Sequence, residues 1–376
     1  MNYPCPYGLA KNHTAGMIDC MLWTYLRARL VQRTARLFMQ PVMRFAPVTP
    51  RTIRALRAIE NGMAKAPRSR YVEPVKYELG GVRVESMSHR YGPTSGATIL
   101  YFHGGGFMSC GIETHRRLCE RLARHTGAEV ISVDYVQLPD GAIPDSVRDA
   151  MKAYVGLLDI CLEPGKIVVA GDSAGGYLAM KVAELATRRG LQPPAAILGF
   201  SPMLSLDPDR EDTAVERIDP VNDAFLPPKR LPRIRALWVP DDSAIEGFAS
   251  PLYAAAYVNS PVFMTAVEDE LLRPEVEKVA LLFADRGLEV ETHIWRKQVH
   301  AFPVLADFLP ESKHAIALAA DFVRIAVGEL ERDVPVDEEV LVGDVNDASP
   351  DAPAEEESID GVVVNDKPGR WFSPVS

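Results

Sequence analysis

The chain has 376 residues, of which 47% are hydrophobic and 24% are charged, with a mean hydropathy of −0.04. This length permits one large core or two modest ones, and no apolar run is long enough for a membrane-spanning helix. The N-terminus has no basic start followed by an apolar segment, and the five scattered cysteines match no zinc spacing. We therefore expect a cytoplasmic protein from a reducing compartment.

The net charge of −10 is unevenly distributed. Residues 1–70 carry 12 Lys and Arg against 2 Asp and Glu, whereas residues 333–376 carry 2 against 12. The basic segment is short and opposed by acidic charge elsewhere, so we expect no nucleic-acid partner. The acidic tail at 331–376 cannot bury enough apolar area to offset its ordering entropy, and we expect it to be disordered.

An N-terminal helical segment is expected over residues 1–70. Residues 17–45 predict an amphipathic helix that Pro41 should end or kink, and a second helix is expected at 50–63. Apolar residues recur at one-turn spacing in the first helix, with most arginines off their line: Ile18, Leu22, Leu26 and Leu30. Our main interpretation is that this helix packs on the main domain. The alternative is a basic helix lying on an anionic membrane surface.

Between about residues 71 and 330, apolar strands alternate with helical patterns. Strands are expected at 97–102, 129–135, 166–170, 195–200, 261–267 and 290–295. Helices are expected at 143–160, from just after Ser173 to 189, at 274–286 and at 311–328. The alternation predicts an α/β domain with a mostly parallel central sheet flanked by helices. The Pro- and Asp-rich segment at 205–248 breaks the rhythm and is expected to be an inserted cap.

The strongest chemical motif is Gly171-Asp172-Ser173-Ala174-Gly175-Gly176. It fits G-x-S-x-G, with an expected strand before it and an expected helix after it. The glycines permit a sharp turn that presents the serine hydroxyl above the sheet, and the helix start favours developing negative charge. We predict that Ser173 is a catalytic nucleophile.

A second motif, His103-Gly104-Gly105-Gly106-Phe107, directly follows the expected strand at 97–102. A tetrahedral intermediate carries negative charge on the former carbonyl oxygen, and preorganised backbone N–H groups must point at it. Gly104, Gly105 and Gly106 form the expected oxyanion loop, with Gly105 and Gly106 as donors and Ala174 as the third. His103 is expected to be structural.

The nucleophile needs a base, and three histidines follow Ser173 in the chain: His293, His300 and His314. We predict His300, which follows a strand after a short loop, whereas the other two fall within a strand and a helix. The acid should follow the preceding strand, in Glu268-Asp269-Glu270. All three carboxylates are chemically able; we prefer Asp269 and hold Glu268 second.

Five motifs together resemble the hormone-sensitive-lipase-like esterases over about residues 71–328. They are HGGGF at 103–107, GDSAGG at 171–176, SPLY at 250–253, EDELL at 268–272 and VHAF at 299–302. The resemblance implies an α/β-hydrolase fold whose helical cap comes from the N-terminal residues and the 205–248 insert. It also implies hydrolysis of small esters with short to medium acyl chains, no metal or cofactor and, in some members, a homodimer. The family's acid stands at the position of Asp269.

Two positions depart from the family pattern. Val136 replaces an arginine that often follows Asp134-Tyr135, which puts a structural salt bridge in question rather than the chemistry. The acid loop has Asp-Glu-Leu where Asp-Pro-Leu is common.

Two other functions stay open. The same triad serves amide or acetyl hydrolysis, as in arylacetamide deacetylases, and the sequence does not separate ester from amide cleavage. A small-ligand binding protein on an esterase scaffold, like the plant gibberellin receptor, usually lacks the histidine that this chain has.

Overall fold

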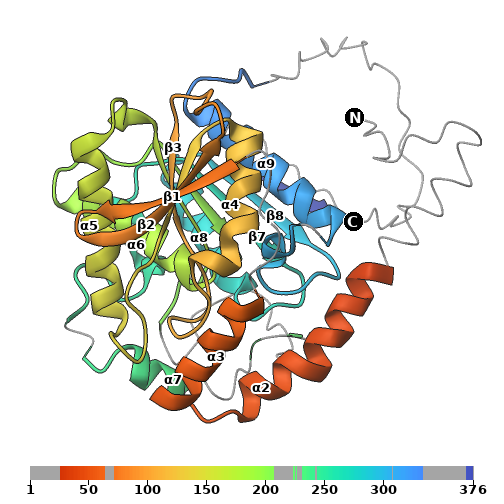
Figure 1. Cartoon of the computed structure of the whole chain (residues 1–376). Coiled ribbons are helices and arrows are strands. Elements are labelled where there is room, and N and C mark those ends of the chain that lie inside the picture. The colour runs from red at the N-terminus through yellow and green to blue at the C-terminus, as the bar shows by residue number, and fades with distance from the viewer. Residues whose placement is uncertain are drawn as a thin grey trace, which may run out of the picture.

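The computed structural model describes residues 26–63, 72–206, 223–224, 226, 231–241, 244–306, 308–332 and 370–375. In this part of the chain a nine-stranded sheet forms the centre of the molecule (Figure 1). Its spatial order is β1 (Val72–Leu79), β2 (Val82–His89), β4 (Glu129–Val133), β3 (Thr98–Phe102), β5 (Ile167–Asp172), β6 (Ala196–Phe200), β7 (Val262–Val267), β8 (Val290–Trp295) and β9 (Arg370–Val375). β1 pairs antiparallel with β2 and β2 with β4, and all other pairs are parallel.

Helices cover both faces of the sheet. On one face lie α4 (Ile112–Thr126) and α9 (Pro310–Ala326), and on the other lie α5 (Ile143–Ile160), α6 (Ala174–Arg188) and α8 (Arg273–Asp285). The mostly parallel sheet and its flanking helices confirm the predicted α/β class.

Strand β3 illustrates why these runs become central strands. All five of its residues are buried. Leu100 and Phe102 join the core under α5 and α6, whereas Ile99 and Tyr101 join the core under α4 and α9. Successive side chains of a strand point to opposite faces, so a strand covered on both sides must be apolar throughout.

Residues 26–45 form one continuous helical segment, made of α-helix at 26–34, a π-helical turn at Ala35–Met39 (η1) and α2 (Gln40–Phe45). Of the two effects expected of Pro41, an end or a kink, the helix does not end there. It lies at the start of α2, directly after the π turn, and the wider turn accommodates the proline ring and its missing N–H.

The helix packs on the main domain as expected, but not through its apolar line. Leu26 and Leu30 are 51% and 66% exposed, whereas Ala28 and Ala35 are buried. The other two residues of the apolar line lie outside the described residues. The helix therefore packs through small side chains and leaves large apolar ones on the surface.

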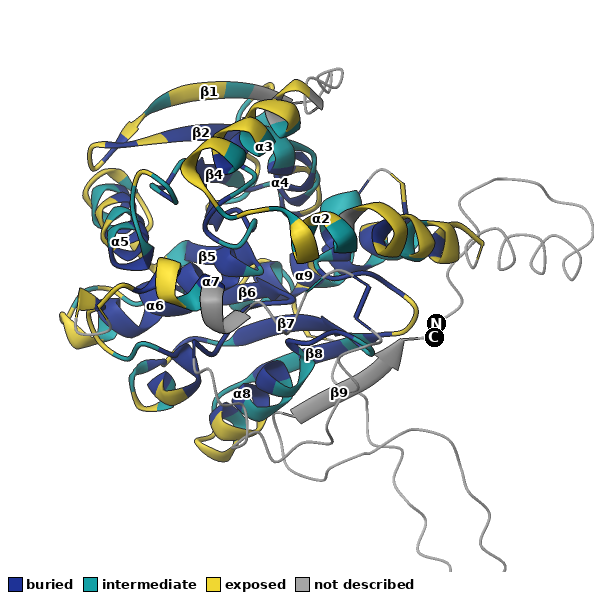
Figure 2. Cartoon of the chain, turned by 90° about the horizontal axis from the view of Figure 1, so that it is seen from below, coloured by how far each residue is buried: buried dark blue, intermediate teal, exposed yellow. Residues whose placement is uncertain are grey.

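Three helices lie together at one end of the sheet, at the bottom of Figure 1 and toward the viewer in Figure 2. They are α2, α3 (Pro50–Met63) and α7 (Leu231–Trp238). The second N-terminal helix is confirmed by α3. Most of the expected insert at 205–248 lies outside the described residues, and α7 is its described helix. None of the described helices is long and apolar enough to cross a bilayer.

The expected disorder of the tail is wrong for residues 370–375, which form β9 in parallel with β8. The free edge of β8 offers unpaired backbone groups, and the segment RWFSPV is rich in residues that favour strands. Residues 333–369 lie outside the described part of the chain.

Candidate active site

Ser173 occupies the sharp turn between β5 and α6. Its backbone has φ 51° and ψ −119°, a conformation that L-residues rarely adopt. Glycines on either side permit this turn: a Cβ on Gly175 would lie 1.9 Å from the carbonyl oxygen of Phe102, and one on Gly171 2.3 Å from the backbone of Gly175. The turn sets Ser173 at the N-terminus of α6, as the motif predicts.

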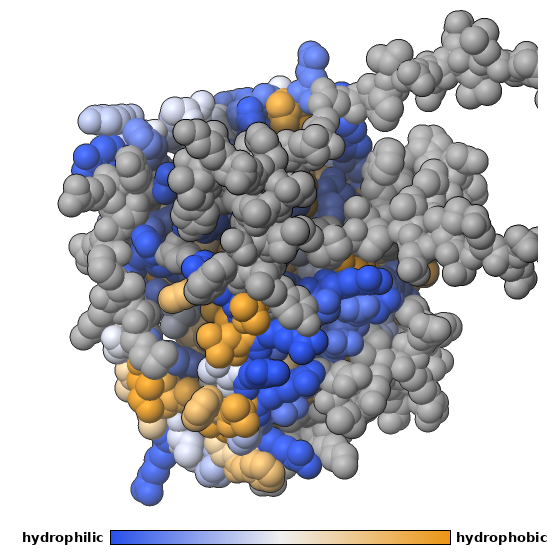
Figure 3. Space-filling view, turned by 90° about the vertical axis from the view of Figure 1, so that its right-hand side faces the viewer, coloured by the Kyte–Doolittle hydropathy of each residue, from blue (hydrophilic) through white to orange (hydrophobic). Residues whose placement is uncertain are grey.

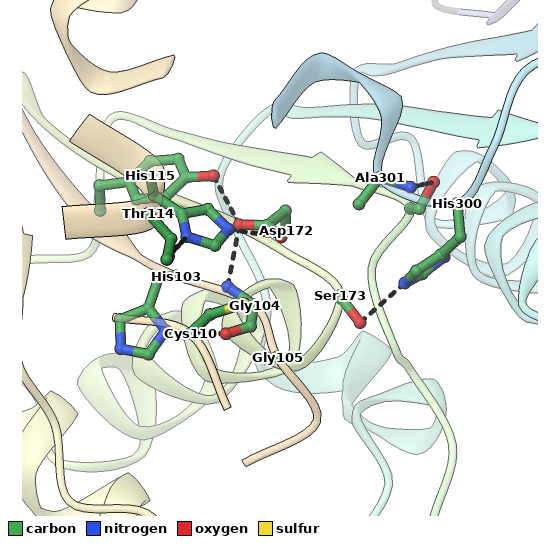
Figure 4. Close-up of polar contacts among 12 residues, drawn as sticks. His103, Gly104, Gly105, Cys110, Thr114, His115, Asp172, Ser173, His300 and Ala301 are labelled. Atoms are coloured by element: carbon green, nitrogen blue, oxygen red, sulfur yellow. Dashed lines mark hydrogen bonds and ion pairs between the residues drawn. The ribbon is translucent and has the colours of Figure 1, made fainter. Parts of the chain in front are cut away.

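The hydroxyl of Ser173 faces His300 (Figure 4). The distance from Ser173 Oγ to His300 Nε2 is 2.9 Å, and His300 Nδ1 lies 2.9 Å from Oε2 of Glu270. A carboxylate only accepts hydrogen bonds, so Nδ1 carries the proton and Nε2 is free to accept the serine proton. The three residues follow β5, β8 and β7, whose carboxyl ends meet at one edge of the sheet.

The carboxylate that contacts His300 is therefore Glu270, and the preference for Asp269 is wrong. After β7 the chain turns so that the Val267 amide donates to Glu270 Oε1 at 2.9 Å, and the Glu270 side chain is buried. Asp269 and Glu268 are only partly buried. Three consecutive acids are chemically alike in sequence, and only the turn decides which one points inward.

Burial lowers the pKa of His300, but the hydrogen bond and negative charge of Glu270 outweigh that effect. The net result is a raised pKa. Glu270 thus strengthens His300 as a base and stabilises the imidazolium that forms when it takes a proton.

The loop after β3 contains Gly105 and Gly106, the glycines predicted to be oxyanion donors. Gly105 and Gly106 have φ of 112° and 61°, values that favour glycine. Among hydrogen bonds between described residues, none is donated by the amides of Gly105, Gly106 or Ala174. Gly104 differs from the expectation, because its N–H donates to Asp172 Oδ1 at 2.9 Å. Gly104 therefore anchors the loop and is not a free donor.

Sequence reasoning missed the role of Asp172, the residue before the nucleophile. Its buried carboxylate accepts from Gly104 N–H and, at 2.7 Å, from Tyr101 Oη, and it lies 3.2 Å from His115 Nε2 (Figure 4). Burial raises the pKa of Asp172, but His115 outweighs this and the pKa falls. Burial likewise lowers the pKa of His115, and Asp172 raises it overall. Asp172 and His115 thus each favour the charged form of the other. The signal in the sequence is the place of Asp172 inside the GDSAGG motif.

The remaining histidines behave as expected. His293 Nε2 lies 2.7 Å from Glu291 on the same strand, and His314 packs edge-on against Trp295. His103 is fully buried, which lowers its pKa to about 4, and it stacks on Tyr135 with 4.5 Å between ring centroids. Within the described residues, no group of three His, Cys, Asp or Glu side chains is arranged to hold a metal ion.

Comparison with known proteins agrees with this geometry. A family model described as the alpha/beta hydrolase fold matches residues 99–304. Esterase LipU of Mycobacterium tuberculosis is 32% identical over 61% of this chain and 78% of its own. An acetyl-hydrolase of Streptomyces hygroscopicus is 28% identical over 62% of this chain and 77% of its own.

A solved structure of an esterase from the bacterial hormone-sensitive lipase family superposes with a TM-score of 0.69 at 25% identity, covering 85% of this chain and all of that one. Family model, relatives and fold agree with the resemblance drawn from the motifs. The chain belongs to the α/β-hydrolase fold family, among relatives that are hormone-sensitive-lipase-like esterases.

Proposed function

We propose that this protein is a serine esterase that hydrolyses small carboxylic esters of short to medium acyl chain length. The observation that carries the proposal is the continuous chain of contacts from Ser173 through His300 to the buried Glu270, at 2.9 Å each. The amides of Gly105, Gly106 and Ala174, which donate to no other described residue, add the donors that an acyl-transfer intermediate requires.

In the first step His300 Nε2 takes the Ser173 proton as Oγ attacks the ester carbonyl. The negative charge that develops on the carbonyl oxygen is stabilised by the amides of Gly105, Gly106 and Ala174, at the positive end of α6. His300 then gives its proton to the leaving alcohol, and the acyl group stays on Ser173.

In the second step water replaces the alcohol. His300 takes a proton from the water, whose oxygen attacks the acyl-enzyme, and then returns the proton to Ser173 as the acid leaves. Glu270 keeps the ring in the tautomer needed for both steps. No metal or cofactor takes part in this scheme.

We further propose that helices α2, α3 and α7 act as the cap over the site and that the catalytic domain spans residues 71–330. α3 and α7 both contact the oxyanion loop, through Arg57 Nε to the Met108 carbonyl at 3.2 Å and Trp238 Nε1 to the Gly106 carbonyl at 2.6 Å. Side chains of these helices are therefore placed to limit the size of the acyl or alcohol group.

Hydrolysis of p-nitrophenyl esters from acetate to palmitate tests the proposal. We expect rapid turnover of the shorter chains and a decline at the long ones, because the cap limits the space beside Ser173. A folded protein that turns over none of these esters would contradict the esterase assignment. Faster cleavage of matched p-nitroanilides would favour an amide or acetyl hydrolase instead. The name of the acetyl-hydrolase relative supports this alternative hypothesis.

The helical segment 26–45 also supports the proposed peripheral contact with an anionic membrane. Six large apolar side chains of this segment are 48–74% exposed: Leu26, Leu30, Leu37, Phe38, Val42 and Phe45. Five arginines belong to the same segment: Arg27, Arg29, Arg33, Arg36 and Arg44. Figure 3 displays apolar and hydrophilic atoms side by side in the lower part of the face that includes this segment. An apolar face flanked by arginines suits a lipid surface with negative headgroups.

Co-sedimentation with vesicles tests this contact. We expect binding to phosphatidylcholine vesicles that contain phosphatidylglycerol, weakening as salt is added, and at least about tenfold weaker binding after Leu37→Gln with Phe38→Gln, because each side chain loses buried apolar area. Ile160→Gln with Leu162→Gln is the matched control, since these exposed residues lie at the end of α5. Absence of binding at low salt would contradict the contact. A dimer in solution that the Leu37 and Phe38 changes dissociate would assign the face to a second copy instead.

The unpaired state of the described cysteines, Cys110, Cys119 and Cys161, supports the proposed cytoplasmic location.

A further inference from the structure

Every backbone carbonyl of the oxyanion loop, from His103 to Phe107, accepts a hydrogen bond. Tyr135 Oη donates to the His103 carbonyl at 2.7 Å, and His103 Nδ1 donates to the Gly104 carbonyl at 2.7 Å. The Gly105 carbonyl accepts from Met108 N, Ser109 N and Ser109 Oγ, the Gly106 carbonyl from Trp238 Nε1, and the Phe107 carbonyl from Leu138 N. Of these five carbonyls, the one bonded to a distant helix is that of Gly106, whose partner lies on α7.

Fixing a carbonyl fixes the whole peptide plane, because the peptide is planar and its N–H points opposite to its C=O. The Gly106 N–H belongs to the peptide whose carbonyl is that of Gly105. The Gly105 carbonyl holds the plane that carries the Gly106 N–H, and Trp238 holds the plane that follows it. Gly106 has φ 61° and is free to adopt other conformations, so the loop keeps its shape only while both planes are held.

The residue after Gly106 makes the bond to Trp238 more important. Phe107 has φ 56°, a strained value for a bulky residue. Rotation of the Gly106–Phe107 peptide changes this φ and offers a way to relieve the strain. The indole N–H opposes that rotation, since the rotation would carry the Gly106 carbonyl away from it.

Trp238 also encloses the donor glycine by contact. A Cβ on Gly106 would lie 3.7 Å from the Trp238 ring. The rings of Trp238 and Phe107 pack edge to face, with 6.1 Å between their centroids. Trp238 is only 7% exposed. If the Gly106 carbonyl turned away, water would not replace it as the partner of the indole N–H, and a buried donor would be left unpaired.

Helix α3 holds the far end of the same loop. Glu60 Oε2 accepts from the Cys110 amide at 2.7 Å, and Arg57 donates to the Met108 carbonyl at 3.2 Å. Arg57 also donates to the Leu138 carbonyl. Both the N-terminal segment and the inserted segment thus bond to the backbone of the oxyanion loop.

We propose that Trp238 is a positioning residue for the oxyanion hole, through which docking of the α7 segment holds in place the loop that carries the Gly105 and Gly106 donors. The proposal rests on the esterase function proposed above. It means that the cap contributes to transition-state stabilisation as well as to the choice of substrate.

The test compares Trp238→Phe, which removes the indole N–H and keeps an aromatic ring, with Ile160→Ala, a change at an exposed residue at the end of α5. We expect kcat of Trp238→Phe to fall about tenfold with KM nearly unchanged, because a misdirected donor weakens the transition state alone. Affinity for a trifluoromethyl ketone, whose oxyanion occupies the hole after Ser173 adds to it, should fall in parallel. Ile160→Ala should match the wild type.

A second pair of variants, at Glu60, keeps the proposal testable if Trp238→Phe fails to fold. Glu60→Gln keeps an acceptor for the Cys110 amide and should retain activity, whereas Glu60→Ala should lower kcat and ketone affinity together. Thermal unfolding of each variant reports whether it is folded.

Unchanged kcat and ketone affinity in folded Trp238→Phe would overturn the proposal, as would a rise in KM alone, which would make Trp238 a pocket wall. If Trp238→Phe is too unstable to assay, the Glu60 pair decides, and equal activity of its two variants would overturn positioning of the loop by the cap. Loss of ester turnover in the wild type itself would instead contradict the proposed function.

Discussion

Replacement of Ser173 by alanine is expected to lower kcat by roughly 10⁶-fold, the scale seen when a nucleophile of a serine triad is removed. The change deletes only the hydroxyl, whose hydrogen bond is to His300 Nε2. The Cβ stays, so the strained turn at φ 51° stays as well. We therefore expect a folded protein with an unfolding temperature close to that of the wild type. Steady-state hydrolysis of p-nitrophenyl butyrate and thermal unfolding measure the two quantities.

The matched control is Ser88→Ala, on strand β2 of the antiparallel hairpin, purified in the same way. It should keep full activity, and the loss of activity in Ser173→Ala purified in parallel then excludes a contaminating host esterase. Activity retained by Ser173→Ala would contradict the nucleophile assignment, and an unfolded variant would leave the structure of the turn, rather than its chemistry, in need of revision.

Replacement of Glu270 by glutamine should lower kcat by about 10⁴-fold, whereas Asp269→Asn should stay within about twofold of the wild type. Glutamine keeps an oxygen for the Val267 amide, which directs its NH₂ group at His300 Nδ1. That donor forces the proton onto Nε2, the atom that must accept from Ser173. The same assay applied to both variants separates the two neighbouring acids.

The pH profile adds a second readout for Glu270. Since Glu270 raises the pKa of His300 and the base must be unprotonated, activity should rise with pH through that pKa. Residual activity of Glu270→Gln should therefore reach half of its plateau at lower pH than wild-type activity. The reverse ranking, with Asp269→Asn inactive and Glu270→Gln normal, would contradict the observed geometry.

Local signals in the sequence were sufficient for most of the parallel sheet. The six expected strands correspond to β3, β4, β5, β6, β7 and β8 within two residues at most ends, because each is a short apolar run bounded by turns. The β1–β2 hairpin was not predicted, although Gly80 and Gly81 with φ of 59° and 79° mark its turn. Strand β9 could not be foreseen, because its partner is an edge formed by residues far away in the chain.

The sequence predicts which loops form the site, but it does not always predict which residue of a loop takes part. Ser173 and His300 stand alone in their loops, so order and spacing sufficed to choose them. Glu270 competes with two neighbouring acids, and the turn after β7 decides. Gly104 has the same composition as the two other glycines, yet its amide is taken by Asp172, a contact between residues 68 positions apart.

The helix at 26–45 reveals a limit of periodicity. Leucines at one-turn spacing predict an apolar stripe along a helix. They do not predict which side of the helix packs on the domain. Ala28 and Ala35 permit a closer approach of the helix backbone than the leucines do, and they form the buried side.

The most direct test of the central claim is to trap the covalent intermediate. The protein is treated with diethyl p-nitrophenyl phosphate, which transfers its diethylphosphoryl group to an activated serine, and digested for tandem mass spectrometry. We predict one adduct, on Ser173, accompanied by loss of esterase activity, and none in Ser173→Ala or, on the same time scale, in Glu270→Gln. An unmodified Ser173 in active protein, or an adduct on another residue that tracks the loss of activity, would contradict the account.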